Sequence, residues 1–292
     1  MSLRLLGLLL TAAAAGLPAQ GAVNTGRAAG SDAAIRIWSL TGSLRITAWA
    51  RDSVHVQGRV DPGAGHFGLG GTREALKLSV EPPEGREPDG VADLDIRVPA
   101  RARLWIKSAA ADIEVTLQGG TVEVTSVSGR VRLAGQAASA TVETLDGNVE
   151  LALDGPLARV RTASGTIVVR GVLQELEAVT VSGPLLVGME GTVHRVRLET
   201  VASEIAFKGD LDADGHLEAA THGGDIELRL PPRLAATWQL VSYVAAPVNE
   251  LLPPALLRPG GRKGEWVATT GDGRATVQVR TFKGRVVLKV RG

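Results

Sequence analysis

The stretch Thr144–Leu151 reads TLDGNVEL, and it decides between two folds. An Asp-Gly pair lies between two short segments of alternating apolar residues, and alone this pattern predicts an antiparallel β-hairpin. However, Gly147 recurs at a constant interval, as Gly129 before it and as Gly165 and then Gly183 after it. A fixed period indicates stacked repeats, provided that the surrounding residue classes recur with it.

The residue classes around Gly147 recur in nine copies of the repeat. With Gly147 taken as position zero, apolar residues stand five positions before it, two after it and four after it in every copy. Position zero is occupied by Gly42, Ala111, Gly129, Gly147, Gly165, Gly183, Ser203, Gly224 and Gly284. The position three before zero always carries a hydroxyl group: Ser39, Ser108, Ser126, Thr144, Thr162, Thr180, Thr200, Thr221 and Thr281. A tenth, degraded copy is indicated by Trp238, Leu240 and Ser242.

This repetition favours a solenoid over a meander of hairpins. A meander needs alternating strands but not the same residue class at the same offset in successive copies, whereas stacked coils bring equivalent positions into columns. We therefore predict an all-β, single-stranded parallel β-helix, or β-solenoid, with coils of about 18–21 residues that each stack on the coil before. Gly147 is expected to let the chain turn, Thr144 to bond the neighbouring coil, and Val149 and Leu151 to fill the core.

Outward charges also indicate parallel stacking. Six positions before zero, successive copies carry Arg159, Glu177, Arg197 and Glu218, which alternate in sign. In-register coils would place these opposite charges side by side. Each pair would be solvated and would contribute about 0–1 kcal/mol, so its value is as an indication of register.

The first 22 residues have the pattern of a secretory signal peptide. Arg4 precedes the apolar stretch Leu5–Gly16, and small residues follow at Ala19, Gly21 and Ala22. The alternative is an uncleaved anchor, although the apolar stretch is shorter than the roughly 20 residues of a bilayer span. The sequence therefore predicts an exported protein, periplasmic or extracellular, whose mature chain has no transmembrane segment. It has no cysteine, which excludes disulfides and thiolate metal ligands.

One elongated domain is expected over residues 23–292. Residues 35–60 are interpreted as an entry coil or cap, and residues 61–90 and 249–264, rich in Gly and Pro, as loop insertions. The terminal segment RVVLKVRG (285–292) is expected to form an open end of the solenoid, with Lys289 and Arg291 discouraging edge-to-edge association.

Two segments resemble a known family. GSLRITAWARDSVHVQG (42–58) is similar to the entry motif of the DUF4097 family of β-strand-repeat proteins, called putative adhesins, and DLDIRVPARARLWIKSAAADIEV (93–115) resembles its strand, Val-Pro, strand, turn, strand segment. The T-x-x-G-x-(V/I) repeats that follow resemble the body of the family. The resemblance covers nearly all of the mature chain and implies a single-stranded β-helix. It transfers no catalytic or binding residues.

The sequence offers one candidate metal site and no other cofactor. Asp210, Asp212, Asp214 and Gly215 match D-x-D-x-D-G, the start of a calcium loop in which oxygen ligands surround a sharp turn. The Glu expected at the twelfth position is replaced by Thr221. A polar turn between coils is the preferred interpretation, and calcium is the alternative.

An outward apolar strip is the candidate contact surface. Three positions after zero, Val168, Leu186 and Ala206 follow one another in successive coils and should face solvent. Contiguous exposed apolar residues can mark a contact site. Two hypotheses remain open: the 249–264 loop folds back over the strip, or a partner binds there.

The function that these patterns favour is a non-enzymatic structural or adhesin-like scaffold at the cell envelope. Its partner would be an envelope protein or polysaccharide that the sequence does not identify, and the oligomeric state is left open. The near balance of 32 basic and 31 acidic residues gives no tendency to bind nucleic acid, and an aromatic content of 3% counts against base-stacking and sugar-stacking platforms. The alternative is a β-helix enzyme acting on polysaccharide, for which Asp225, Glu227 and Glu204 with Arg170 and Lys208 are the available groups.

Overall fold

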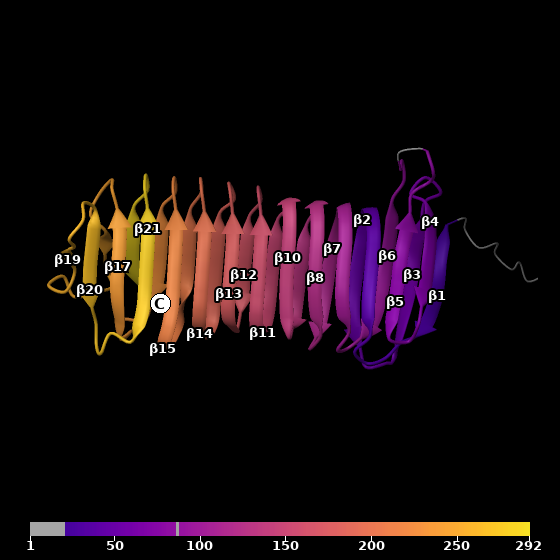
Figure 1. Cartoon of the computed structure of the whole chain (residues 1–292), viewed down its shortest axis with the longest axis horizontal. Coiled ribbons are helices and arrows are strands. Elements are labelled where there is room, and N and C mark those ends of the chain that lie inside the picture. The colour runs from indigo at the N-terminus through magenta and orange to yellow at the C-terminus, as the bar shows by residue number, and fades with distance from the viewer. Residues whose placement is uncertain (1–20, 86–87) are drawn as a thin grey trace, which may run out of the picture.

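The computed structural model describes residues 21–85 and 88–292 and shows an all-β protein (Figure 1). The predicted signal peptide, residues 1–22, lies outside the described residues except for Gly21 and Ala22, and Ala22 begins the first strand. The strands are β1 (Ala22–Ala28), β2 (Ala34–Trp49), β3 (Ser53–Val60), β4 (His66–Gly71), β5 (Ala75–Glu81), β6 (Ala92–Pro99), β7 (Arg103–Gln118), β8 (Thr121–Ser128), β9 (Val131–Gln136), β10 (Ser139–Asp146), β11 (Val149–Thr162), β12 (Ile167–Gly171), β13 (Leu173–Thr180), β14 (Leu185–Thr200), β15 (Ile205–Thr221), β16 (Ile226–Leu230), β17 (Ala236–Ser242), β18 (Val248–Asn249), β19 (Arg258–Pro259), β20 (Glu265–Thr269), β21 (Ala275–Thr281) and β22 (Val286–Val290). Residues 21–85 and 88–292 contain no helix that would span a lipid bilayer.

The strands form two parallel faces that enclose one core, as the solenoid prediction requires. The front face runs β5, β2, β7, β8, β10, β11, β13, β14, β15, β21 and β17, all paired in parallel. The back face runs β6, β2, β7, β9, β11, β12, β14, β15, β16, β22 and β18. Long strands such as β7 and β15 pass round a corner and so contribute to both faces.

The register confirms the predicted columns and rejects the hairpin at Thr144–Leu151. Thr144, on β10, pairs in parallel with Ser126 and Thr162, and Val149, on β11, pairs in parallel with Val131 and Ile167. The column through Val149 continues through buried side chains on the next five strands of this face, as far as β22: Ile167, Leu185, Ile205, Ile226 and Val286. The interval along it is constant as far as Leu185 and becomes slightly longer at Ile205 and Ile226, whereas Val286 comes from a coil much later in the chain.

The order of coils in the stack differs from their order in the chain at both ends. Near the N-terminus, β5 and β6 lie on one side of β2 while β7 lies on the other, so β2 is an internal coil and not a cap. Near the C-terminus, β21 is inserted between β15 and β17, and β22 between β16 and β18. The expectation that each coil stacks on the preceding one therefore fails at these two places.

The prediction of an open end at RVVLKVRG is wrong for the same reason. β22 is bonded on both sides, and Lys289 forms an ion pair with Glu227 (N–O 2.8 Å). Arg291 donates to the carbonyl oxygen of Met189 (3.1 Å). These two cations bond the inserted coil to its neighbours and do not lie at a free sheet edge.

Antiparallel strands close both ends. β3 pairs with β6 and β1 with β3, while β4 pairs with β5 inside the 61–90 segment. At the other end β20 pairs with β17, and β19 with β20. The 249–264 segment is anchored at its start, because Leu251 and Leu252 are buried as part of the core, while residues 253–255 and 261–263 are exposed.

Glycine at position zero is required by close packing between coils. A Cβ on Gly147 would overlap the carbonyl oxygen of Gly129, and a Cβ on Gly183 would overlap that of Gly165. Gly147 has no positive φ, so the expectation that it serves the turn itself is replaced by this steric reason. Glycine is favoured where another backbone approaches closely.

At the C-terminal coils the hydroxyl three positions before zero bonds both its own corner and the corner of the neighbouring coil. Thr281 Oγ1 donates to the carbonyl oxygen of Gly224 (2.9 Å) and accepts from the amide of Gly284 (3.0 Å). Thr221 makes the equivalent bonds to Ser203 and Gly224 (3.0 and 3.2 Å). Thr144 is different, because its buried Oγ1 has no hydrogen-bond partner among the residues that the structure describes. The predicted bond to the neighbouring coil is thus present at Ser108, Thr162, Thr200, Thr221 and Thr281, whereas Ser39, Ser126 and Thr180 bond only their own corner and Thr144 bonds neither.

This difference gives opposite expectations for the same substitution at two coils. Thr281→Val leaves a partly buried carbonyl and a buried amide without these partners, so we expect it to lower the free energy of unfolding by about 1–3 kcal/mol. Thr144→Val removes a buried hydroxyl that has no partner, so we expect it to be neutral or to stabilise by up to about 1 kcal/mol. Urea unfolding of both variants measures the two values, and equal destabilisation would contradict the assignment.

Candidate functional site

An exposed row of apolar side chains runs along one corner of the solenoid, two positions before zero. We call it the corner ridge, and its members in stack order are Val127, Leu145, Ala163, Val181, Val201, His222, Phe282 and Tyr243. Val127 and Leu145 lie near the ends of β8 and β10, and the other members lie in the turns that follow β11, β13, β14, β15, β21 and β17. Narrow turns of this kind project beyond the strand ends at the top of Figure 1. Leu145 is 59% exposed and Val181 53%, so the side chains point to solvent and not into the core.

Hydrogen bonds hold the ridge residues directly above one another. The amide of Ala163 donates to the carbonyl oxygen of Leu145 (3.1 Å), Val181 to Ala163 (3.2 Å), and Val201 to Val181 (3.1 Å). Eight coils at a strand spacing of about 4.8 Å give the ridge a length of about 34 Å. Polar residues flank it, including Ser128, Asp146, Ser164 and Ser182. An exposed apolar surface with a polar rim is typical of contact sites.

The C-terminal end of the ridge is aromatic. The ring of Phe282 stacks on His222 with 5.0 Å between centroids, and Tyr243 lies 5.1 Å from Phe282 at a tilt of 50°. The three residues directly follow β21, β15 and β17, so this cluster exists only because β21 is inserted between the other two. The chain order of the repeats hides this neighbourhood. The ridge was not predicted from the sequence, although a signal for it exists in the apolar residues that recur two positions before zero.

The predicted strip of Val168, Leu186 and Ala206 is present as neighbours on β12, β14 and β15. Leu186 is 37% exposed and forms the floor of a shallow hollow of about 280 Å³. Arg170 and Lys208 line the rim of this hollow, one on each side of Gly188, which is opposite both of them in the sheet. The 249–264 segment does not line this hollow and packs against the end of the core, so the hypothesis that it covers the strip is not supported.

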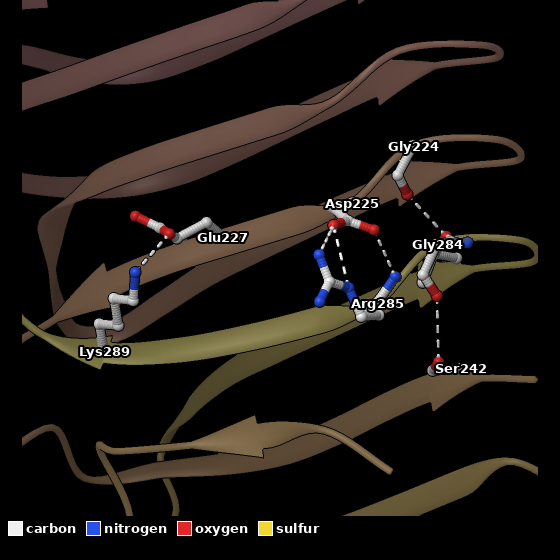
Figure 2. A network of polar contacts seen from close by, with 8 residues as sticks. Gly224, Asp225, Glu227, Ser242, Gly284, Arg285 and Lys289 are labelled. Atoms are coloured by element: carbon white, nitrogen blue, oxygen red, sulfur yellow. Dashed lines mark hydrogen bonds and ion pairs between the residues drawn. The ribbon is translucent and has the colours of Figure 1, made fainter. Parts of the chain in front are cut away.

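Two of the three carboxylates considered for polysaccharide chemistry, Asp225 and Glu227, are paired with cations (Figure 2). Asp225 accepts from the backbone amide of Arg285 (2.7 Å) and from its guanidinium (2.8 Å). Glu227 lies 2.8 Å from Lys289 and 2.6 Å from Arg229. The amide and guanidinium of Arg285 lower the pKa of Asp225, and Lys289 lowers that of Glu227. A general acid for glycoside cleavage needs a raised pKa, and these ion pairs have the opposite effect on Asp225 and Glu227. The pairs are better suited to holding neighbouring strands in register than to catalysis.

The three aspartates of the calcium motif lie on the long strand β15 and have separate partners. Asp212 bonds His194 Nδ1 (2.9 Å), and Asp214 forms an ion pair with Arg274 (2.7 Å). Asp210 is opposite Thr192 on β14. Among the residues that the structure describes, no group of three or more His, Asp or Glu side chains is arranged to hold a metal ion. The geometry therefore gives the calcium alternative no support.

The ion pair of Asp225 predicts a pH dependence of stability. Because its pKa in the folded protein is lowered, the pair stabilises the protein above the ordinary Asp pKa near 3.8, and this stabilisation is lost as pH falls through the lower folded value. We expect Asp225→Asn to reduce the free energy of unfolding by up to about 1 kcal/mol at neutral pH, since the pair is partly exposed.

The same substitution should cost less near pH 2 than at neutral pH, because the charge-dependent stabilisation by the pair fades as the pH falls below the ordinary Asp pKa. Urea unfolding at both pH values provides the measurement. A loss of equal size at both would show that the amide-accepting oxygen matters and the charge does not.

Comparisons with known proteins add little to this description. No family model matches the chain, and no curated protein matches it either. A solved structure named a putative adhesin, from Bacteroides fragilis, is similar over 94% of this chain and 100% of its own, with 11% identity and a TM-score of 0.45. A putative cell adhesion protein from Clostridium sporogenes is similar over 92% and 98%, with 9% identity and a TM-score of 0.22. Both TM-scores lie below 0.5, so neither likeness carries an argument about function. Membership of the DUF4097 family stays a prediction.

Proposed function

We propose that this protein is an exported, non-enzymatic β-solenoid that serves as an adhesin-like interaction scaffold at the cell envelope. The observation that carries the proposal is the corner ridge, an exposed apolar row about 34 Å long that is held in place by the coil-to-coil hydrogen bonds. A rigid ridge with a polar rim fits a protein partner, which would bury the apolar side chains at little cost in conformational entropy.

The hollow around Leu186 is a second, smaller contact surface in this proposal. Its apolar floor of Val168, Leu186 and Ala206 lies on the back face, and the ridge lies at the corner, so one partner or two could be held by the same coils. The competing function, an enzyme acting on polysaccharide, would need a carboxylate free to act as a general acid. Asp225 and Glu227 are instead bonded to cations.

The ridge is tested by polar substitution without loss of fold. We expect Val181→Ser/Val201→Ser to change the free energy of unfolding by less than about 1 kcal/mol, because both side chains are half exposed. The same variant should bind isolated cell envelopes at least about tenfold more weakly than the wild type, since apolar contact surface is lost. Co-sedimentation of the protein with envelopes measures the binding.

A matched control uses exposed valines that are not on the ridge. Val172→Ser/Val290→Ser removes the same groups from side chains of similar exposure and should leave binding unchanged. Leu186→Arg tests the hollow in the same assay. If both the ridge variant and the Leu186 variant bind as the wild type does, neither surface is a contact site and the proposal fails.

A further inference from the structure

A patch of tryptophans and cations covers the outer side of the front face near the N-terminus. We call it the basic-tryptophan face, and it consists of Lys77 on β5, Arg36 and Trp38 on β2, and Arg103, Trp105 and Lys107 on β7. Their neighbours along each strand are buried, and the side chains of Ile35, Ile37 and Ile106 are at most 1% exposed. Because successive side chains of a strand point to opposite sides, the residues of the patch face outward.

The register sets the two tryptophans and two of the cations in a checkerboard. Arg36 on β2 is directly opposite Trp105 on β7, and Trp38 is directly opposite Lys107. Each indole thus has a cation beside it on the adjacent strand, about 4.8 Å away along the sheet. The two tryptophans are far apart in the chain, and only the direct stacking of β7 on β2 brings them together.

The patch carries an excess of positive charge. On the front face, the outward positions of β5, β2, β7 and β8 hold four cations, Lys77, Arg36, Arg103 and Lys107, against two carboxylates, Glu81 and Glu123, which leaves an excess of two. Lys77 is paired with Glu81 (2.9 Å). Within the described part of the chain, neither Arg36 nor Lys107 forms an ion pair.

Three outward arginines further along this side of the solenoid are matched to carboxylate partners. Arg159 and Arg161 both approach Glu177 (3.6 and 2.8 Å), and Arg197 is paired with Glu199 (2.7 Å). Arg36 and Lys107 are therefore cations whose counter-charge is not supplied by the neighbouring coils. A ligand that supplies it would bring carboxylates or similar groups to a surface that also offers two indole rings.

We propose that the basic-tryptophan face binds an acidic polysaccharide, a chain of sugars that bear carboxylates. This inference rests on the proposed function, and it names the chemistry of one ligand of the scaffold. Each uronic acid ring has a face of C–H groups, which packs on an indole, and a carboxylate at its edge, which accepts hydrogen bonds from a guanidinium or ammonium on the next strand. The checkerboard of rings and cations matches that alternation of apolar face and charged edge.

The patch fits such a polymer better than it fits nucleic acid. Binding of nucleic acid draws most of its free energy from many phosphate contacts, and this patch has an excess of only two charges in a chain of net charge +1. The low aromatic content of the whole chain counted against a sugar-stacking platform. The structure shows why that average is misleading, because two of the five tryptophans are gathered on one face.

Polygalacturonate provides the probe, with neutral dextran as the comparison. The full protein should bind polygalacturonate, with affinity that falls as salt rises, and should not bind dextran. Isothermal titration should show that Arg36→Glu/Lys107→Glu weakens this binding by at least about tenfold, because two attractive charges become repulsive. Trp38→Ala/Trp105→Ala should weaken it by about threefold or more, with the salt dependence retained.

The matched control reverses two other exposed arginines of the same face. Arg195→Glu/Arg280→Glu makes the same change in net charge on β14 and β21, far along the stack, and should bind polygalacturonate as the wild type does. An equal loss of binding in this control would show that net charge alone causes the effect, and it would contradict the proposed binding site. Tight binding of a single-stranded oligonucleotide that is lost in Arg36→Glu/Lys107→Glu would also overturn it, in favour of nucleic acid.

The ridge variant separates this inference from the proposed function. Val181→Ser/Val201→Ser should keep full binding to polygalacturonate while losing retention on envelopes. If the wild type shows no affinity for polygalacturonate but envelope retention still depends on the ridge, this inference fails and the scaffold function stands. If polygalacturonate binds and the ridge and Leu186 variants are retained normally, the proposed contact surfaces fail and the polysaccharide site stands.

Discussion

In-register parallel hydrogen bonding between coils is the interaction on which the rest of this structure depends. It requires each corner to lie directly on the corner of its neighbour, which leaves no room for a side chain at most copies of position zero. The hydroxyl three positions earlier can then bond backbone carbonyl and amide groups at the tight corner. Thr281 does so with the carbonyl oxygen of Gly224 and the amide of Gly284. The apolar columns follow from the same alignment, since each Val, Ile or Leu meets its equivalent one coil away.

The surfaces proposed to be functional are consequences of that alignment. The corner ridge exists because one position of every turn is repeated along the stack, and the basic-tryptophan face exists because β2 and β7 are direct neighbours. A solenoid of this kind does not need a cleft to present a site. It presents rows whose length is set by the number of coils and whose chemistry is set by one position of the repeat.

Much of the fold could be predicted from the repeat, and particular residues show where prediction stopped. The columns through Thr144 and Val149 were correct because burial imposes the same residue class on every coil. The insertion of β21 between β15 and β17 was missed, since residue classes at matching offsets fit equally well beside several coils. The role of Gly147 was misassigned because a turn and a close approach both favour glycine. The candidate strip of Val168, Leu186 and Ala206 was found, whereas the pairing of Asp225 with Arg285 joins distant parts of the chain and depends on the inserted coil.

The order of the inserted coil is the most direct test of this account, and a chain without cysteine makes the test simple. Glu218 and Gln278 are opposite each other on β15 and β21, and Gln239 on β17 is one strand further away. We expect Glu218→Cys/Gln278→Cys to form a disulfide under mild oxidation, because neighbouring strands are about 4.8 Å apart. Glu218→Cys/Gln239→Cys should not form one, since two strand spacings exceed the reach of a disulfide, about 7 Å between Cα atoms. The reverse result, a crosslink in the second variant and none in the first, would show that the coils follow chain order and would contradict the structure.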